Sequence, residues 1–227
     1  MINSKKKYRE LKFSSFLRTL KDVRKVSIMR TLMNQLIEDI KFKGKLLDIG
    51  GGENCNYRDT LKNTNYTSVN IDQKISPDFL IKVNEKIPII DNSFDTCLMF
   101  NVLEHIYDWN FIFDEIRRLL IRNGKIFIII PFLYPIHAAP NDYLRVTSSY
   151  LNQFLENNNF IKIQTYPISY GPFTNAQIIG YSHYTIKAFQ KIICVILDRL
   201  FRFLFPKKFL SYSESNPLFY FIEATLN

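Results

Sequence analysis

The fold is decided by the stretch Leu46-Leu47-Asp48-Ile49-Gly50-Gly51-Gly52-Glu53. A short apolar strand at 45–49 ends here in a turn that has no side chains. The chain has seven glycines where about sixteen are usual for this length, and three of them are consecutive in this turn. Glycine lets the backbone approach a ligand closely because no Cβ stands in the way. The stretch therefore predicts a strand that leads into a ligand-binding turn.

Apolar periodicity predicts further strands and helices downstream. We expect strands at 66–71, 79–83, 94–100, 127–130, 161–166 and 218–225, a weak helical segment at 57–61, and helices at 108–124 and 148–157. The strand at 127–130 is entirely apolar, which is typical of a parallel sheet covered on both faces. Strands that alternate with helices predict an open α/β sheet that binds ligands at the carboxyl ends of its strands.

The charge is uneven along the chain. Residues 1–45 hold 13 Lys and Arg against 4 Asp and Glu, whereas the rest holds 17 of each, so the net charge of +9 belongs to the N-terminal part. Apolar residues recur there at helical spacing. We expect a basic helical arm at 1–44 and one domain at 45–227 with an insertion at about 167–216. Such an arm docks on nucleic acid, anionic lipid or an acidic partner, or is a solvated helix that aids solubility.

The cysteine count and the apolar segments predict a location. Three cysteines without a CxxC pair indicate a reducing compartment. There is no signal-peptide pattern and no apolar run of about 18 residues. We therefore expect a cytoplasmic protein, with peripheral contact to the inner face of the membrane as an open alternative. No His or Cys cluster has metal-ligand spacing, so we expect no metal ion.

The glycine turn distinguishes between two nucleoside ligands. A dinucleotide fingerprint requires a third glycine, but Cys55 stands at that position. Asp48, two residues before the turn, would repel a pyrophosphate. Asp72 follows Gly52 by 20 residues, where an acid binds ribose hydroxyls. A cationic ligand with a ribose fits better, and the sulfonium S-adenosylmethionine is such a ligand.

Five motifs lie in order within residues 45–131: Leu47–Gly52, Val69–Asp72, Ile87–Asp95, Val102–Ile106 and Arg118–Lys125. Together they resemble the class I S-adenosylmethionine-dependent methyltransferases, in particular type 11-like domains. The loop Pro131–Arg145 resembles the corresponding segment of methyltransferases from polysaccharide biosynthesis clusters. The resemblance implies a three-layer sandwich with a mostly parallel seven-stranded Rossmann-like sheet and helices on both faces. It also implies S-adenosylmethionine as the cofactor.

The resemblance assigns the cofactor contacts. It places Asp48, Gly50 and Gly52 at the methionine end and Asp72 at the ribose. Asn84 stands where many members carry an acid beside the adenine amino group, and its amide oxygen can accept the same hydrogen bond. Asn101 follows strand 94–100 on the side of the methyl group. The alternatives are that Asp48 only caps the turn and that Asn101 only shapes its loop.

The acceptor is expected against the loop Pro131–Arg145, which concentrates polar side chains among prolines and aromatic residues. The predicted catalytic residues are His137, Tyr143 and Arg145. His137 is the candidate base because a hydroxyl acceptor loses its proton during transfer. The alternative for His137 is that it hydrogen-bonds Asp142 or the backbone and merely shapes the loop, and the alternative for Tyr143 and Arg145 is that they only tie the loop down. Glu104-His105 is expected to be a structural pair.

An amphipathic helix is predicted at 186–204. Its apolar face carries Ile186, Phe189, Ile192, Ile193, Ile196, Leu197, Leu200, Phe203 and Leu204, and its opposite face is mostly polar and cationic. Three uses remain open: contact with a membrane, pairing in a homodimer, and cover for the protein's own domain.

The sequence thus predicts a methyltransferase that transfers a methyl group in line, without a metal, to a small-molecule or glycan-like acceptor, most readily at oxygen. The alternatives are C- or N-methylation of a lipid-soluble ring and a non-catalytic nucleoside-binding module. Nucleic acid is disfavoured as an acceptor because Asn101-Val102-Leu103-Glu104 is not an Asp/Asn-Pro-Pro-aromatic motif.

Overall fold

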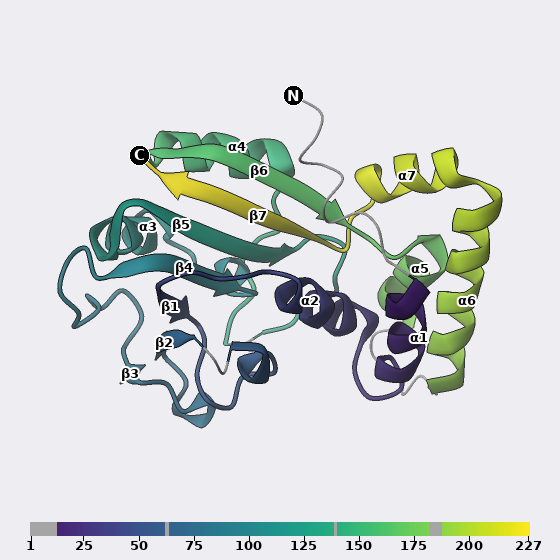
Figure 1. Ribbon diagram of the computed structural model, residues 1–227, viewed down its shortest axis with the longest axis horizontal. Helices are drawn as coiled ribbons and strands as arrows, with labels where there is room; N and C mark the ends of the chain where they lie inside the picture. The colour runs from purple at the N-terminus through teal and green to yellow at the C-terminus, as the bar shows by residue number, and fades with distance from the viewer. Residues whose placement is uncertain (1–12, 62–63, 139, 182–187) are drawn as a thin grey trace. The chain divides into compact units, whose positions relative to one another are not determined.

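A seven-stranded sheet organises the computed structural model, which describes residues 13–61, 64–138, 140–181 and 188–227. The strand order is β3-β2-β1-β4-β5-β7-β6 (Figure 1). Pairing is parallel from β3 through β5, and β7 runs against its neighbour β6 (Figure 1). The predicted Rossmann-like fold is confirmed. The bounds are β1 Lys45–Ile49, β2 Asn65–Asn70, β3 Phe79–Leu80, β4 Phe94–Phe100, β5 Leu120–Pro131, β6 Phe160–Ile168 and β7 Phe219–Leu226.

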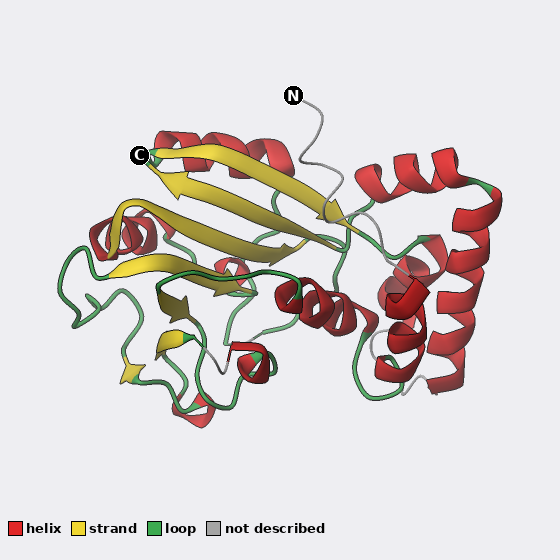
Figure 2. Ribbon diagram, viewed as in Figure 1, coloured by secondary structure: helices red, strands yellow, loops and turns green. Residues whose placement is uncertain are grey.

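Seven helices lie in the described residues (Figure 2): α1 Phe13–Asp22, α2 Ile28–Glu38, α3 Trp109–Leu119, α4 Ser148–Asn157, α5 Pro172–Tyr181, α6 Ala188–Leu204 and α7 Pro206–Ser215. Three of them begin at a side-chain cap. Ser27, Asp108 and Thr147 each accept a backbone N–H from the first turn of α2, α3 and α4, which satisfies donors that have no partner inside the helix.

The chain divides into two compact units. One contains residues up to 40, 132–135 and 166–219, and the other contains 41–131, 136–165 and 220–227. The N-terminal arm and the insertion, predicted as separate additions, therefore belong to one unit. Contacts between them include Lys191 Nζ, which donates to the carbonyl of Val26 at 3.3 Å, and Arg199, which lies over the ring of Phe16.

Several predicted boundaries are wrong. The periodic stretch up to residue 40 forms two helices, because Ser27 caps a new helix after the turn at 23–26. Asn123-Gly124 does not end α3 but lies inside β5. The end of α3 is fixed earlier, since the backbone N–H groups of Asn92 and Ser93 bind the carbonyls of Arg118 and Leu119. Helices α5 and α7 were not predicted.

Arg118 explains why the motif at 87–95 is fixed in place. Its guanidinium donates to the carbonyls of Ile87 and Ile89 and to the carboxylates of Asp91 and Glu115. Glu115 in turn accepts the N–H of Ile87 at 2.9 Å. One side chain of α3 thereby ties the segment before β4 to the helix after it.

Helix α6 has its polar face inward. Asp198 is fully buried and accepts the backbone N–H groups of Phe173 and Thr174 at the start of α5, at 2.9 and 2.8 Å. A carboxylate is favourable there because the helix dipole is positive at its N-terminus. The apolar face is left exposed, with Leu200 at 49% and Phe203 at 80%. Within the unit that contains α6, this face is therefore left largely uncovered among the described residues. None of the described helices has the length and apolar character needed to cross a bilayer.

The glycine turn rests on a buried carboxylate. Asp48 at the end of β1 is fully buried, and its oxygens accept hydrogen bonds from the hydroxyls of Tyr57 at 3.0 Å and Tyr66 at 2.7 Å. A Cβ on Gly51 would lie 2.0 Å from Asp48 Oδ2, and one on Gly52 would lie 2.3 Å from the carbonyl of Ile75. Any side chain at either position would displace this packing, so the turn must be bare.

The burial of Asp48 predicts an unusual pH dependence of stability. Desolvation raises the pKa of Asp48 from 3.8 to about 6, although both tyrosine hydroxyls oppose the shift. The folded chain then holds this proton more tightly than the unfolded chain, so the contribution of Asp48 to the free energy of unfolding falls as pH rises through about 6. The free energy of unfolding of the wild type, minus that of Asp48→Asn, should fall by about 1.4 kcal/mol between pH 5 and pH 8. Urea unfolding at the two pH values measures it.

The exposed Asp72 supplies the matched control, because Asp72→Asn makes the same chemical change outside the core. The prediction would be contradicted if the free energy of unfolding of the wild type, minus that of Asp48→Asn, stayed constant or increased as pH rises.

Candidate functional site

The candidate site lies at the carboxyl ends of adjacent strands. Gly50 follows β1, Asp72 follows β2 and Asn101 follows β4, and β1 lies between the other two in the sheet. The N–H of Gly50 donates to the carbonyl of Val69 at 2.7 Å, and the amide of Asn70 donates to the carbonyls of Gly50 and Gly51. These bonds fasten the turn after β1 to the end of β2.

The predicted cofactor residues differ in their access to a ligand. Asp72 is exposed, and its carboxylate caps the short segment Gln73–Ile75 by accepting the N–H of Lys74 at 2.9 Å. Asn84 is exposed beyond β3, and both it and Asn101 adopt positive φ, at 57° and 56°. Asparagine tolerates that backbone conformation better than most residues. Asp48 is buried beneath the turn rather than exposed on its surface. It is therefore placed to support the turn and not to make the direct contact with the ligand that the resemblance implies.

These residues fit S-adenosylmethionine. The turn offers backbone that is close-packed from below and carries no Cβ, which suits close approach by a nucleoside. Asp72 supplies an exposed carboxylate at the end of the next strand, where ribose hydroxyls can donate to it. An amide at Asn84 can accept from an adenine amino group.

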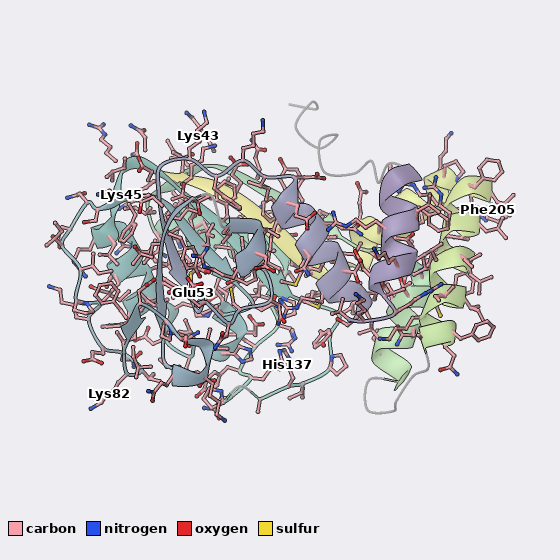
Figure 3. The ribbon with its side chains drawn as sticks, turned by 60° about the horizontal axis from the view of Figure 1, so that its bottom comes forward. Lys43, Lys45, Glu53, Lys82, His137 and Phe205 are labelled. Carbon is pink, nitrogen blue, oxygen red and sulfur yellow. The ribbon has the colours of Figure 1, made fainter. Side chains whose placement is uncertain are left out.

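The loop after β5 is fastened to the end of β4 (Figure 3 labels His137 on this loop). The N–H of Tyr143 donates to the carbonyl of Glu104 at 2.8 Å. His105 Nδ1 bonds to the carbonyl of Asn141, so this nitrogen carries the proton because a carbonyl only accepts. The loop thereby brings His137 against His105, with ring centroids 5.1 Å apart and an interplanar angle of 82°.

Asp142 organises the loop from inside. Its carboxylate accepts the backbone N–H of His137 at 2.9 Å, lies 3.4 Å from His137 Nδ1 and binds both terminal nitrogens of Arg145. The hydrogen bonds from Arg145 and from the His137 backbone lower the pKa of Asp142. A carboxylate beside Nδ1 orients the imidazole and leaves Nε2 as the nitrogen that can take a proton. The contact with Asp142 is also what the alternative for His137 predicts, namely a histidine that hydrogen-bonds Asp142 and shapes the loop.

The other two predicted acceptor-side residues are placed differently. The guanidinium of Arg145 binds Asp142 with two hydrogen bonds, so its charge helps to hold the loop. Tyr143 is 48% exposed, and its ring packs edge-on against the exposed Tyr107 with centroids 5.6 Å apart. Its hydroxyl is accessible to a ligand, whereas Arg145 acts through Asp142.

Three candidate metal ligands come together across this loop. One ligand atom from each of Glu104, His105 and His137 lies within 4.8 Å of the others. Glu104 is fully buried, and its Oε1 is 3.7 Å from His105 Nε2. No short spacing along the chain marks this cluster, because His137 is 32 residues beyond His105.

Comparisons with known proteins support the same family. A family model described as a methyltransferase domain matches residues 47–128. None of the curated proteins matches the chain in sequence.

Solved structures are similar in fold. A S-adenosylmethionine-dependent methyltransferase from Archaeoglobus fulgidus has a TM-score of 0.58 at 16% identity, covering 92% of this chain and 99% of its own. A Thermotoga maritima protein described as a possible histamine N-methyltransferase has a TM-score of 0.59 at 14% identity, and the match covers 95% of this chain and 100% of that protein. The [4+2]-cyclase SpnF has a TM-score of 0.56 at 10% identity, and the match covers 89% of this chain and 84% of SpnF. At these identities the likeness shows the fold alone.

The matched residues 47–128 contain the bare turn of β1, the acid that follows β2 and the whole of α3. They also supply four of the seven strands of the sheet and the start of a fifth, β5. Motifs, strand order and family model agree: residues 47–128 match a methyltransferase domain, and the sheet has the Rossmann-like fold of solved S-adenosylmethionine-dependent methyltransferases, so S-adenosylmethionine is the cofactor expected for this domain.

Proposed function

We propose that this enzyme transfers the methyl group of S-adenosylmethionine to a hydroxyl of a small-molecule or glycan-like acceptor, in line and without a metal. The observation that carries the proposal is the carboxylate of Asp142, 3.4 Å from Nδ1 of His137. A hydroxyl becomes a good nucleophile as it loses its proton, and an oriented imidazole is suited to receive that proton at Nε2. The rest of the task is to hold both reactants and exclude water.

For the cofactor we propose that Asp72 binds the ribose hydroxyls and Asn84 the adenine amino group. Gly50 and Gly52 would lie along the methionine end, and Asn101 would face the methyl group. Asp48 would act through the turn that it supports from below.

On the acceptor side, we propose that the exposed hydroxyl of Tyr143 contacts the acceptor while Arg145 fixes Asp142. A sugar hydroxyl suits this arrangement, because the loop offers polar groups beside aromatic rings. A role in polysaccharide biosynthesis in the cytoplasm follows from the resemblance of this loop to that class of methyltransferase.

We further propose that α6 holds the enzyme at the inner face of an anionic membrane. It is the described part of the predicted helix 186–204, of which residues 186 and 187 lie outside the described residues. Support comes from the exposed apolar side chains of α6 and from Lys207 and Lys208, which are exposed directly beyond it. The basic N-terminal part adds positive charge of the same kind, and each Lys or Arg near an anionic surface contributes about 1 kcal/mol. A homodimer through the same face is the competing partner.

The cofactor proposal predicts the effect of removing the carboxylate at Asp72. Asp72→Ala should weaken the binding of S-adenosylhomocysteine by about one to two orders of magnitude, because hydrogen bonds to a charged group contribute about 1.5–3 kcal/mol. Calorimetry measures this affinity. Asp72→Asn is the matched control, since an amide oxygen can still cap Gln73–Ile75, and it should fall between wild type and Ala. Unchanged affinity in Asp72→Ala would refute the ribose contact.

The base proposal predicts a loss of turnover without a loss of cofactor. His137→Ala should lower the rate of methyl transfer by about 10²–10⁴-fold and leave S-adenosylhomocysteine affinity nearly unchanged. The measurement is transfer of a labelled methyl group to extracted cell glycans and lipids. Ile136→Ala changes an exposed neighbour in the same loop and should behave as wild type. A His137→Ala enzyme with full activity would instead favour a carbon or amine acceptor.

The membrane proposal predicts sedimentation with vesicles that contain phosphatidylserine at low salt, and release as added salt shortens the Debye length. Leu200→Asp with Phe203→Asp should abolish sedimentation and leave cofactor binding intact, because both side chains are exposed. Val83→Asp with Ile90→Asp makes the same change at exposed positions outside the insertion and should have no effect. A wild type that stays in solution and forms dimers would contradict the membrane proposal.

A further inference from the structure

Two nitrogens of Arg58 form no hydrogen bond within the described residues. Its Nε donates to the carboxylate of Glu53 at 2.8 Å, whereas the terminal nitrogens Nη1 and Nη2 have no acceptor there, although Nη1 is buried. A buried donor that lacks an acceptor costs free energy, and more so when the group is charged. The two terminal N–H groups of a guanidinium are parallel, which is the pattern that both oxygens of a carboxylate accept.

The guanidinium of Arg58 lies beside the glycine turn. Its partner Glu53 directly follows the three glycines and is labelled in Figure 3. The guanidinium carbon is 4.1 Å from the centre of the Tyr66 ring, and the hydroxyl of Tyr66 would be 2.5 Å from a Cβ on Gly51. Desolvation raises the pKa of Asp48 beneath the turn, and the charge of Arg58 opposes that rise. The two unused donors therefore belong to a cation next to the bare backbone.

The side chain of Arg58 is held in place before a ligand binds. Stacking on the ring of Tyr66 fixes the plane of the guanidinium, and only 18% of the side chain is exposed. Glu53 is 60% exposed, and it orients the guanidinium through Nε while the terminal nitrogens stay available. A side chain that is fixed in advance loses little conformational entropy on binding, which favours affinity.

The chemistry of the cofactor supplies a matching group, because S-adenosylmethionine carries a carboxylate at its methionine end. The proposed function lays that end along Gly50 and Gly52, and a contact with Arg58 rests on that placement. We infer that Arg58 binds this carboxylate through Nη1 and Nη2. The carboxylate would satisfy the buried donor and offset the positive charge. Arg58 would thereby make the enzyme select S-adenosylmethionine over a nucleoside that lacks the carboxylate.

Calorimetry tests the contact with two ligands, S-adenosylhomocysteine and its decarboxylated form, which differ only in the carboxylate. Arg58→Gln should weaken the binding of S-adenosylhomocysteine by about 10- to 100-fold and leave the affinity for the decarboxylated ligand unchanged. Arg58→Lys keeps the charge but not the parallel donors, so its loss should be smaller and confined to the same ligand. The difference between the two ligands separates a contact with the carboxylate from a general disturbance of the turn.

Arg122→Gln is the matched control. It removes the same charge at an exposed position near the amino end of β5, at the opposite edge of the sheet from the glycine turn, and it should bind both ligands as wild type does. Thermal unfolding shows whether each variant is folded, and Arg58→Lys decides the question if Arg58→Gln does not fold.

The contact with Arg58 would be refuted by S-adenosylhomocysteine affinity in the folded Arg58 variants that equals that of wild type, or by an equal loss for both ligands. Either result would leave the Asp72 contact and the proposed methyl transfer standing. A wild type that binds neither ligand would instead overturn the proposed cofactor site together with the contact, so the two failures are distinguishable.

Discussion

The site depends on one buried carboxylate beneath a turn that has no side chains. Asp48 is held by the hydroxyls of Tyr57 and Tyr66, and its Oδ2 occupies the space that a Cβ on Gly51 would need. Burying a carboxylate is costly unless hydrogen bonds satisfy it, so the two tyrosines and the glycine form one unit with it. The turn is thereby held at the end of β1, beside the ends of its parallel neighbours β2 and β4.

The acceptor side is organised by a second carboxylate in a different way. Asp142 binds the backbone of His137 and the guanidinium of Arg145, and this closes the loop upon itself. The backbone of Glu104 then holds the loop through Tyr143. Because the loop and the end of β4 are fastened together, two histidines from distant parts of the chain become neighbours.

In helix α6 a polar contact determines which face of an amphipathic helix is buried. Apolar periodicity reveals two faces but does not say which one is inward. Here Asp198 determines the orientation. Its carboxylate accepts the first N–H groups of α5, and the polar face of α6 is therefore the buried one. The apolar face is consequently exposed, and the chain carries a surface that differs from the usual one of a folded domain.

The sequence by itself determined the sheet, the bare turn and the likeness of residues 47–128 to a methyltransferase domain, because these follow from local patterns. Strands 45–49 and 94–100 and helix 148–157 match β1, β4 and α4 to the residue, since apolar runs, turn residues and caps act over a few positions. The positions of Asp48 and His137 required the tertiary structure. Whether a carboxylate faces a ligand or two tyrosines, and whether a histidine meets another from a remote segment, depends on contacts that no spacing along the chain records.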